Sequence, residues 1–335
     1  MSLPRYTFLL VICSLLALSI AASSGPTTSV NNYHTYLPVT IGAGANPLNV
    51  GLSRYMHTTD SQTLYNLGCA QGQVSPGGYV TLVILDFGQP AYSGSAYGTY
   101  IFYSYAFRST ASIETAAESY LSGFYNCSPA NAALRLVVGT SNYGSGVTAN
   151  HGRAWAAMVN DINSWINATP GLSLKLAARG GNDMEPSWNT ASATRAWVDG
   201  YAAVYVKPSY LYNYGSCDGC AFKQCPSCTP NNHWTVEDIW YVSYGAAPAW
   251  PVPEIYLTNG VHADQWYRIA LYGVNTHASL MQFIASLTQW QACQTNGPCV
   301  SVDNTPVQGW TQLFTALNAN PLTSQTTGYL TDISW

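Results

Sequence analysis

Short apolar runs alternate with amphipathic stretches along most of this 335-residue chain, and this alternation constrains its fold more than any other feature. Buried parallel strands have continuous runs rich in Val, Ile and Leu, whereas apolar residues three and four positions apart indicate helices packed through one face. A strand regularly followed by a helix predicts a mostly parallel sheet with right-handed crossovers. The chain is therefore expected to be an α/β protein.

The segments alternate about eight times, which favours a single (β/α)8 TIM-type barrel over an open doubly wound sheet. Gly42-Ala43-Gly44 lacks the third glycine of a dinucleotide-binding fingerprint and a preceding strand, which weakens the open-sheet alternative. No linker, charge block or repeat divides the sequence, so one barrel domain over 49–335 is expected. The predicted strands are 50–54, 81–87, 135–140, 172–178, 202–206, 239–244, 253–257, 281–287 and 329–333, and the predicted helices are 110–124, 151–168, 189–200, 263–272 and 308–318.

The N-terminus has the three-part pattern of a secretory signal. Arg5 precedes an apolar run over 8–20, and small residues follow at 21–24. The run is shorter than the roughly 20 residues that a membrane-spanning helix requires, although an N-terminal anchor is the alternative interpretation. We expect a signal peptide over 1–23, an N-terminal arm over 24–48, and a secreted protein with no membrane span after cleavage.

The charge balance limits the classes of partner. Eleven Lys and Arg are present against fifteen Asp and Glu, and charged residues make up only 8% of the chain. Nucleic acids and anionic membranes require clustered Lys and Arg, so neither is expected as a partner. With 25 Tyr and 11 Trp, the chain instead suits neutral, hydroxyl-rich ligands such as a polysaccharide or cell-wall glycan. No cofactor is predicted, and a monomer is expected.

Eight cysteines remain after Cys13 leaves with the signal, an even number that is compatible with four disulfides in an oxidising compartment. The four between 217 and 228 have the spacing C-x2-C-x4-C-x2-C, for which zinc binding is the alternative to two local disulfides. The short central spacing and the compartment favour disulfides, and no metal is predicted. The cysteines are Cys69, expected to pair with Cys127; Cys293, expected to pair with Cys299; and Cys217, Cys220, Cys225 and Cys228, whose pairing the sequence leaves open.

The segment 180–188, Gly-Gly-Asn-Asp-Met-Glu-Pro-Ser-Trp, carries two of the chain's scarce carboxylates. Asp183 and Glu185 follow a predicted strand, and residues two apart on an extended chain face the same side about 6.5 Å apart. Active sites of (β/α)8 barrels collect at the carboxyl ends of the strands. Asp86, Glu254 and Asp332 lie at or near other predicted strands, so these acids are expected to converge.

A strand that leads into Asp183-Met184-Glu185, together with the earlier strand-end Asp86, resembles secreted glycoside hydrolase barrels. The likeness is to family 25 lysozymes and to the glycoside-hydrolase-like domains of bacterial envelope proteins. It covers the signal peptide, the alternation of elements and about ten residues around the motif. The resemblance implies a closed barrel and hydrolysis of a glycosidic bond by carboxyl groups.

Glycosidic cleavage needs one protonated and one ionised carboxyl group, and their environments decide which is which. Glu185, beside Trp188, is the candidate acid, and Asp183 is expected to stabilise or orient the positive transition state. Asp86 or Glu254 is the candidate second essential carboxylate. The alternative for these acids is a structural brace, in which a carboxylate accepts hydrogen bonds from turn amides at 180 and 181.

Aromatic and basic side chains supply the candidate substrate-binding residues. Exposed rings can stack on sugars, whereas packing in the core is the competing interpretation for each ring. Arg179 lies next to the acidic motif and could anchor a carboxylated sugar. The candidates are Trp188, Trp250, Tyr244, Tyr256 and Arg179.

Two functions are compatible with these residues. The first is an exported glycoside hydrolase that acts on a neutral or cell-wall polysaccharide. The second is a non-catalytic barrel that binds glycans or has a structural role in the envelope, because a fold does not by itself fix a function.

Overall fold

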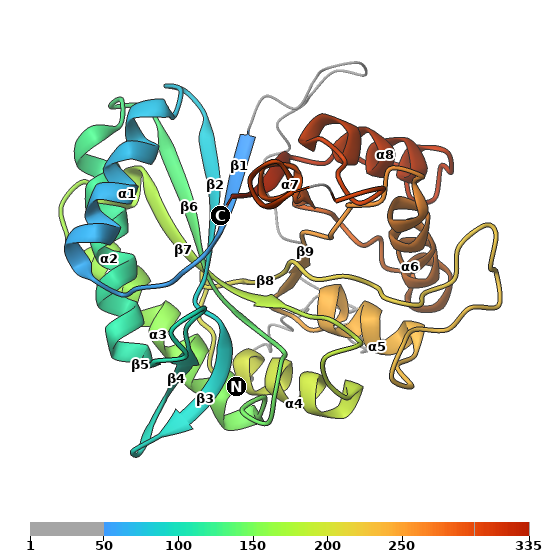
Figure 1. The fold of residues 1–335 in the computed structure, drawn as a ribbon, viewed down its shortest axis with the longest axis horizontal. Coiled ribbons are helices and arrows are strands. Elements are labelled where there is room, and N and C mark those ends of the chain that lie inside the picture. The colour runs from blue at the N-terminus through green and yellow to red at the C-terminus, as the bar shows by residue number, and fades with distance from the viewer. Residues whose placement is uncertain (1–49, 298, 335) are drawn as a thin grey trace, which may run out of the picture. The chain divides into compact units, whose positions relative to one another are not determined.

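A computed structural model describes residues 50–297 and 299–334, and these residues form an eight-stranded, all-parallel sheet surrounded by helices (Figure 1). The strand order is β10-β11-β1-β2-β6-β7-β8-β9. Strands of this sheet that follow one another along the chain are therefore neighbours in it. The strands are β1 (Val50–Tyr55), β2 (Val80–Asp86), β6 (Ala133–Ser141), β7 (Leu176–Asp183), β8 (Leu211–Asn213), β9 (Ala249–Pro251), β10 (Ala285–Thr288) and β11 (Tyr329–Ser334).

The two ends of this sheet meet, which closes it into a barrel. Glu254, just after β9, forms a parallel bridge with Leu287 of β10. Leu287 N–H donates to the Pro253 carbonyl at 2.8 Å, and Ile255 N–H donates to the Leu287 carbonyl at 2.7 Å. The predicted (β/α)8 barrel is therefore confirmed, and the carboxyl ends of its strands share one face.

Helices pack around the barrel and bury a continuous core of apolar side chains between helices and strands. Most begin at a residue whose side chain accepts a hydrogen bond from the first turn, as at Asp60, Ser109, Thr148, Thr190, Thr235 and Thr305. The helices are α1 (Ser61–Val74), α2 (Thr110–Cys127), α3 (Ala149–Ala168), α4 (Ala191–Ala202), α5 (Val236–Trp240), α6 (Val261–His277), α7 (Trp290–Asn296) and α8 (Pro306–Asn318).

Three predicted strands are wrong. The segment 253–257 follows β9 and forms only the single bridge at Glu254. The segment 202–206 ends helix α4 and begins a turn, and the strand of this unit is β8 instead. The apolar segment 239–244 is helical, because Thr235 and Asp238 form a reciprocal capping box that starts α5, and a π-helical turn (Tyr241–Gly245) follows. The strand of this β/α unit is β9, which begins after the helical segment. Strand β7 continues to Asp183, where the sequence predicted a Gly-rich turn from 180.

An antiparallel insert between β2 and α2 extends beyond the carboxyl ends of the barrel strands, and it was not predicted. It consists of β3 (Gln89–Ser93), β4 (Ala96–Tyr100) and β5 (Phe107–Ser109) (Figure 1). Buried His151 of α3 fixes it in place, because its Nε2 donates to the Gly98 carbonyl at 2.8 Å while its Nδ1 accepts from the Trp197 indole at 2.9 Å. Burial lowers the pKa of His151 to about 4, which keeps the ring neutral.

All eight cysteines of the barrel are paired in disulfides. The expected pairs Cys69–Cys127 and Cys293–Cys299 are present. The remaining four form Cys217–Cys220 and Cys225–Cys228, with Cα atoms 5.5 and 5.4 Å apart, so they are not zinc ligands. The disulfide interpretation of the C-x2-C-x4-C-x2-C segment therefore holds.

Removing Cys69–Cys127 is expected to destabilise the protein more than removing Cys293–Cys299. The first disulfide links α1 to α2 and closes a loop of 58 residues, whereas the second closes a loop of only 6. Chain entropy gives about 4 kcal/mol for the long loop and about 2 kcal/mol for the short one. Urea unfolding of the two double Cys→Ala variants would check this, and equal losses would contradict it.

The expected signal peptide and N-terminal arm, together with position 49, lie outside the described residues. Within 50–297 and 299–334, the structure contains no helix that is both long and apolar enough to cross a membrane. The four disulfides are the pattern of a protein that folds in an oxidising compartment.

Candidate active site

Four buried carboxyl groups lie at the carboxyl ends of the barrel strands. Asp86 ends β2, Asp183 ends β7, Glu185 follows two residues later, and Glu254 follows β9. Each is less than 9% exposed. One carboxylate oxygen from each of Asp183, Glu185 and Glu254 lies within 4.8 Å of the others. Side chains from two distant parts of the sequence, 183–185 and 254, therefore meet at one point, as the sequence predicted for these three acids.

Asp86 is held from two sides. Its Oδ1 accepts from Gly88 N–H at 2.7 Å, and its Oδ2 accepts from the Tyr214 hydroxyl at 2.8 Å. The Tyr214 ring fits inside the barrel because Gly139 and Gly181 lack side chains, since a Cβ at either position would lie within 2.7 Å of that ring or its hydroxyl. Burial raises the pKa of Asp86 to about 7, and the two hydrogen bonds partly oppose this.

Asp183 is 2% exposed and lies among other negative groups. Burial raises its pKa well above the usual range, and the charges of Glu185, Asp86 and Asp218 raise it further. The brace that was the alternative for the motif is not formed at Gly180, whose N–H donates to the Tyr210 carbonyl instead.

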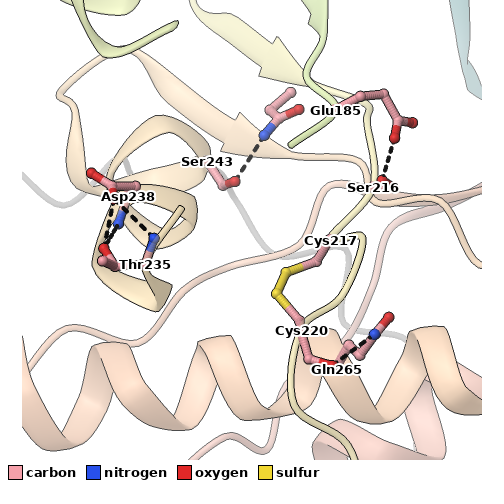
Figure 2. Close-up of a disulfide and its surroundings, with 9 residues drawn as sticks. Glu185, Ser216, Cys217, Cys220, Thr235, Asp238, Ser243 and Gln265 are labelled. Carbon is pink, nitrogen blue, oxygen red and sulfur yellow. Dashed lines mark hydrogen bonds between the residues drawn. A yellow bond between two sulfur atoms is a disulfide. The ribbon is translucent and has the colours of Figure 1, made fainter. Parts of the chain in front are cut away.

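Glu185 is fixed through both its backbone and its side chain. Asn142 holds the backbone, because its Oδ1 accepts from Glu185 N–H and its Nδ2 donates to the Glu185 carbonyl, both at 3.0 Å. The Ser216 hydroxyl donates to Glu185 Oε2 at 2.5 Å (Figure 2). Burial raises the pKa of Glu185 to about 8, and the charge of Asp218 adds to this. Glu185 therefore keeps its proton at neutral pH.

Glu254 completes the cluster. The Tyr256 hydroxyl donates to its Oε1 at 2.8 Å. Burial raises the pKa of Glu254 well above the usual range, and the charges of Glu185 and Asp183 raise it further. Tyr55 lies at the end of β1, close to all four acids. Burial is the main cause that raises the pKa of its hydroxyl, and the charges of the four acids raise it further.

The sequence did not single out four residues of this site, namely Tyr55, Tyr214, Ser216 and Asp218. Ser216 precedes the Cys217–Cys220 disulfide and lies against Glu185 (Figure 2). Asp218 lies between the two cysteines, close enough to Glu185 for its charge to raise the pKa of that acid. The Ser187 hydroxyl donates to Asp218 Oδ2 at 2.9 Å. The Asp between two closely spaced cysteines was the available signal for this loop.

Three predicted substrate-binding residues do not reach the carboxyl cluster. Trp250 is 2% exposed inside the barrel, where its ring contacts Tyr244 and Tyr210 edge-on. Tyr244 and Tyr210 precede β9 and β8, at the opposite end of the barrel from the acids. Arg179 is also buried, four residues before Asp183 on β7, and its guanidinium lies over the Tyr210 ring. Trp250 and Arg179 are therefore packed in the interior, and Tyr244 is half-buried against the core.

Two other predicted residues, Tyr256 and Trp188, do lie at the carboxyl face. Tyr256 bonds Glu254 directly. Trp188 is 40% exposed on the turn that follows Glu185, with its ring edge-on to Tyr143 at 6.1 Å.

Asp332, by contrast, does not join the cluster. Its carboxylate accepts from Trp290 N–H and Gln291 N–H and so caps α7.

The cluster can perform acid and base chemistry. Like charges at this spacing cannot all ionise, so the group retains protons near neutral pH while one member can be charged. Two arginines and one histidine form ion pairs elsewhere in the described chain, with Asp238, Asp264 and Glu237, and none of these pairs includes a cluster carboxyl. Three oxygens at this spacing also suit a hard divalent cation, so activity assays need a chelator control.

Comparisons with known proteins identify no family for this chain. No protein-family model matches the sequence, and no curated protein matches it significantly. Among solved structures, the chain is similar to the crystal structure of a GH18 chitinase from Pseudoalteromonas aurantia. The two are 11% identical with a TM-score of 0.44, over 85% of this chain and 94% of that chain.

Proposed function

We propose that this protein is a secreted glycoside hydrolase that cleaves a neutral or cell-wall polysaccharide with Glu185 as its general acid. The observation that carries the proposal is the convergence of Asp183, Glu185 and Glu254, whose oxygens lie within 4.8 Å of one another at the carboxyl face of the barrel. Hydrolysis of a glycosidic bond requires such a pair of carboxyl groups, one protonated and one ionised. The resemblance of the Asp183-Met184-Glu185 segment to family 25 lysozymes supports the same class of reaction.

Each acid has a separate role in the proposed reaction, in which the cluster holds one ionised and one protonated carboxyl group. Glu185, whose pKa is raised to about 8, donates its proton to the oxygen of the leaving sugar. Glu254 is the second essential carboxylate: its oxygen bonds to the anomeric carbon as the glycosidic bond breaks, and a water deprotonated by Glu185 then releases the sugar from Glu254. Tyr256 orients Glu254 through the bond to Oε1. Asp183 stabilises the positive charge that develops at the anomeric carbon, and Asp86 supports the cluster from behind, held by Tyr214 and Gly88.

The spacing predicts that the product retains the anomeric configuration of the substrate. Inverting enzymes need about 6.5–9.5 Å between the two carboxyl groups to admit a water, whereas retaining enzymes place them about 5–5.5 Å apart. Oxygens of Glu185 and Glu254 within 4.8 Å of each other leave too little room for both a sugar and a water between the two carboxyl groups, which favours the second arrangement. Proton NMR of the first reducing ends released would show the retained anomer, and appearance of the inverted anomer would exclude this pair.

The test of the function is release of reducing ends from a panel of neutral polysaccharides and purified cell-wall glycan, with and without EDTA. Turnover that survives chelation supports the carboxyl mechanism. Saturable binding with no turnover on any member of the panel would replace the hydrolase with the non-catalytic, glycan-binding alternative.

A further inference from the structure

The exposed aromatic residues of the described chain gather at the carboxyl face of the barrel. Seven tyrosine and tryptophan side chains are more than a third exposed. Only Tyr79, which precedes β2, lies at the other end. The others lie on segments that follow β2, β6 or β7, namely Tyr92, Tyr100, Tyr103, Tyr105, Tyr143 and Trp188. An exposed apolar patch of this kind marks an interaction site.

The most exposed pair lies on the loop that joins β4 to β5. Tyr103 is 66% exposed and Tyr105 is 73% exposed. Both have left-handed backbone, with φ of 63° and 49°. This conformation is unfavourable for a bulky residue and persists where the surrounding structure holds it in place. The loop is nevertheless well defined, because Tyr105 N–H donates to the Ile101 carbonyl and Ile101 N–H donates to the Ala106 carbonyl.

Ring contacts connect this loop to the carboxyl cluster. The Phe102 ring lies 4.6 Å from the ring of Tyr55, the residue at the end of β1 beside the four acids. The Tyr103 ring lies 4.1 Å from His57, just after β1. Phe102 therefore anchors the loop against the site, and Tyr103 and Tyr105 project from it toward solvent.

A second exposed pair, Tyr143 and Trp188, lies on the loops that follow β6 and β7. Asn189 joins these loops, because its Nδ2 donates to the carbonyls of Asn142 and Gly144 at 3.0 and 2.9 Å. Asn142 in turn holds the backbone of Glu185. The second pair is thus attached to the same framework as the candidate acid.

The chemistry of these segments favours a neutral ligand. The loops 142–148 and 186–190 contain no charged residue, and the insert over 89–109 contains only Arg108. A polyanion would need clustered cations, and a protein partner held by salt bridges would need charges of either sign. Aromatic rings without charges instead suit the C–H faces of uncharged sugar rings.

We propose that Tyr103, Tyr105, Tyr143 and Trp188 form an aromatic arc along the β1-to-β7 half of the barrel rim, which binds several consecutive neutral sugars of one chain and leads that chain to the carboxyl cluster. This inference rests on the proposed function and adds to it a requirement for long, uncharged substrates.

The test measures binding alone, in a Glu185→Gln background, so that it is independent of turnover. Isothermal titration would compare the disaccharide and the octasaccharide of β-1,4-linked glucose and of β-1,4-linked N-acetylglucosamine. At least one octasaccharide is expected to bind more tightly than its disaccharide. In the Tyr103→Gly/Tyr105→Gly variant the octasaccharide is expected to bind about tenfold more weakly, with the disaccharide unchanged.

Glycine suits this variant because it adopts positive φ without strain, so the loop keeps its backbone conformation. Tyr143→Ala, on a separate loop, should also weaken octasaccharide binding. Tyr79→Ala is the matched control, since this tyrosine is exposed at the opposite end of the barrel, and it should bind as the parent does.

Three results would overturn the arc: unchanged octasaccharide affinity in both arc variants, an equal loss in the Tyr79→Ala control, or no binding of either sugar series by the parent. Hydrolysis by the Glu185→Gln protein at the parent rate would instead contradict the assigned acid while leaving the comparison of affinities valid.

Discussion

Replacing Glu185 by glutamine is expected to lower kcat by about 10²- to 10⁴-fold, the range typical for loss of a general acid. The amide cannot donate a proton to the leaving oxygen, yet it has the same shape and can still accept the Ser216 hydrogen bond. In the parent protein, kcat should fall as the pH rises through about 8, because the proton that Glu185 must donate is then lost.

The control for this experiment is Glu118→Gln, which changes a half-buried glutamate on α2, outside the carboxyl cluster. It should leave kcat unchanged. Near-UV circular dichroism and the Tm would show that both variants fold. If the Glu185→Gln protein retained full turnover, another group would have to be the acid, and Glu254→Gln would be the next variant to measure.

The free energy of unfolding is expected to fall as the pH rises from about 4 to about 8. Burial raises the pKa of Asp86 to about 7 and that of Glu185 to about 8, so the folded state binds more protons than the unfolded state across this window. Stability must then decrease with rising pH and level off above the folded-state values. One pKa unit corresponds to about 1.4 kcal/mol, and each pKa lies about three units above its ordinary value, so the two groups together make the change on the order of 9 kcal/mol.

Urea unfolding at pH 5 and pH 8.5 would measure this change. Glu185→Gln or Asp86→Asn should reduce the difference between the two pH values, since each removes one group that must lose a proton while buried. Asp161→Asn, at an exposed position of α3, should not. A protein that is instead most stable at pH 8.5 would show that these carboxyls ionise freely in the folded state.

The barrel could be predicted from the sequence because its buried parallel strands have long apolar runs. Strand β2 was expected at 81–87 and lies at Val80–Asp86. The short strands β8 and β9 were missed, since three residues carry too little periodicity, and the apolar run at 239–244 resembles a strand more than β9 does. A cap at Thr235, together with packing, decides that segment in favour of a helix.

The four acids could be singled out because carboxylates are rare in this chain and because Asp86, Asp183 and Glu185 end or follow predicted strands. Glu254 was instead placed in a strand at 253–257 that the structure does not contain. The hydroxyls that bind the acids could not be predicted, since Tyr214 is one of 25 tyrosines and its role depends on two glycines of other strands. Glycines 180 and 181 resemble a turn in the sequence. Within β7 they instead leave room for the rings of Tyr201 and Tyr214.

The hydrogen bonds of His151 affect the entropic cost of ligand binding. One imidazole joins the insert, helix α3 and helix α4, and its ring is neutral above about pH 4. These hydrogen bonds hold the insert in a fixed position against the barrel. Because the insert is already ordered, ligand binding costs little conformational entropy of the protein. The remaining entropic cost is that of the ligand, so ligands that are already rigid and extended in water are favoured.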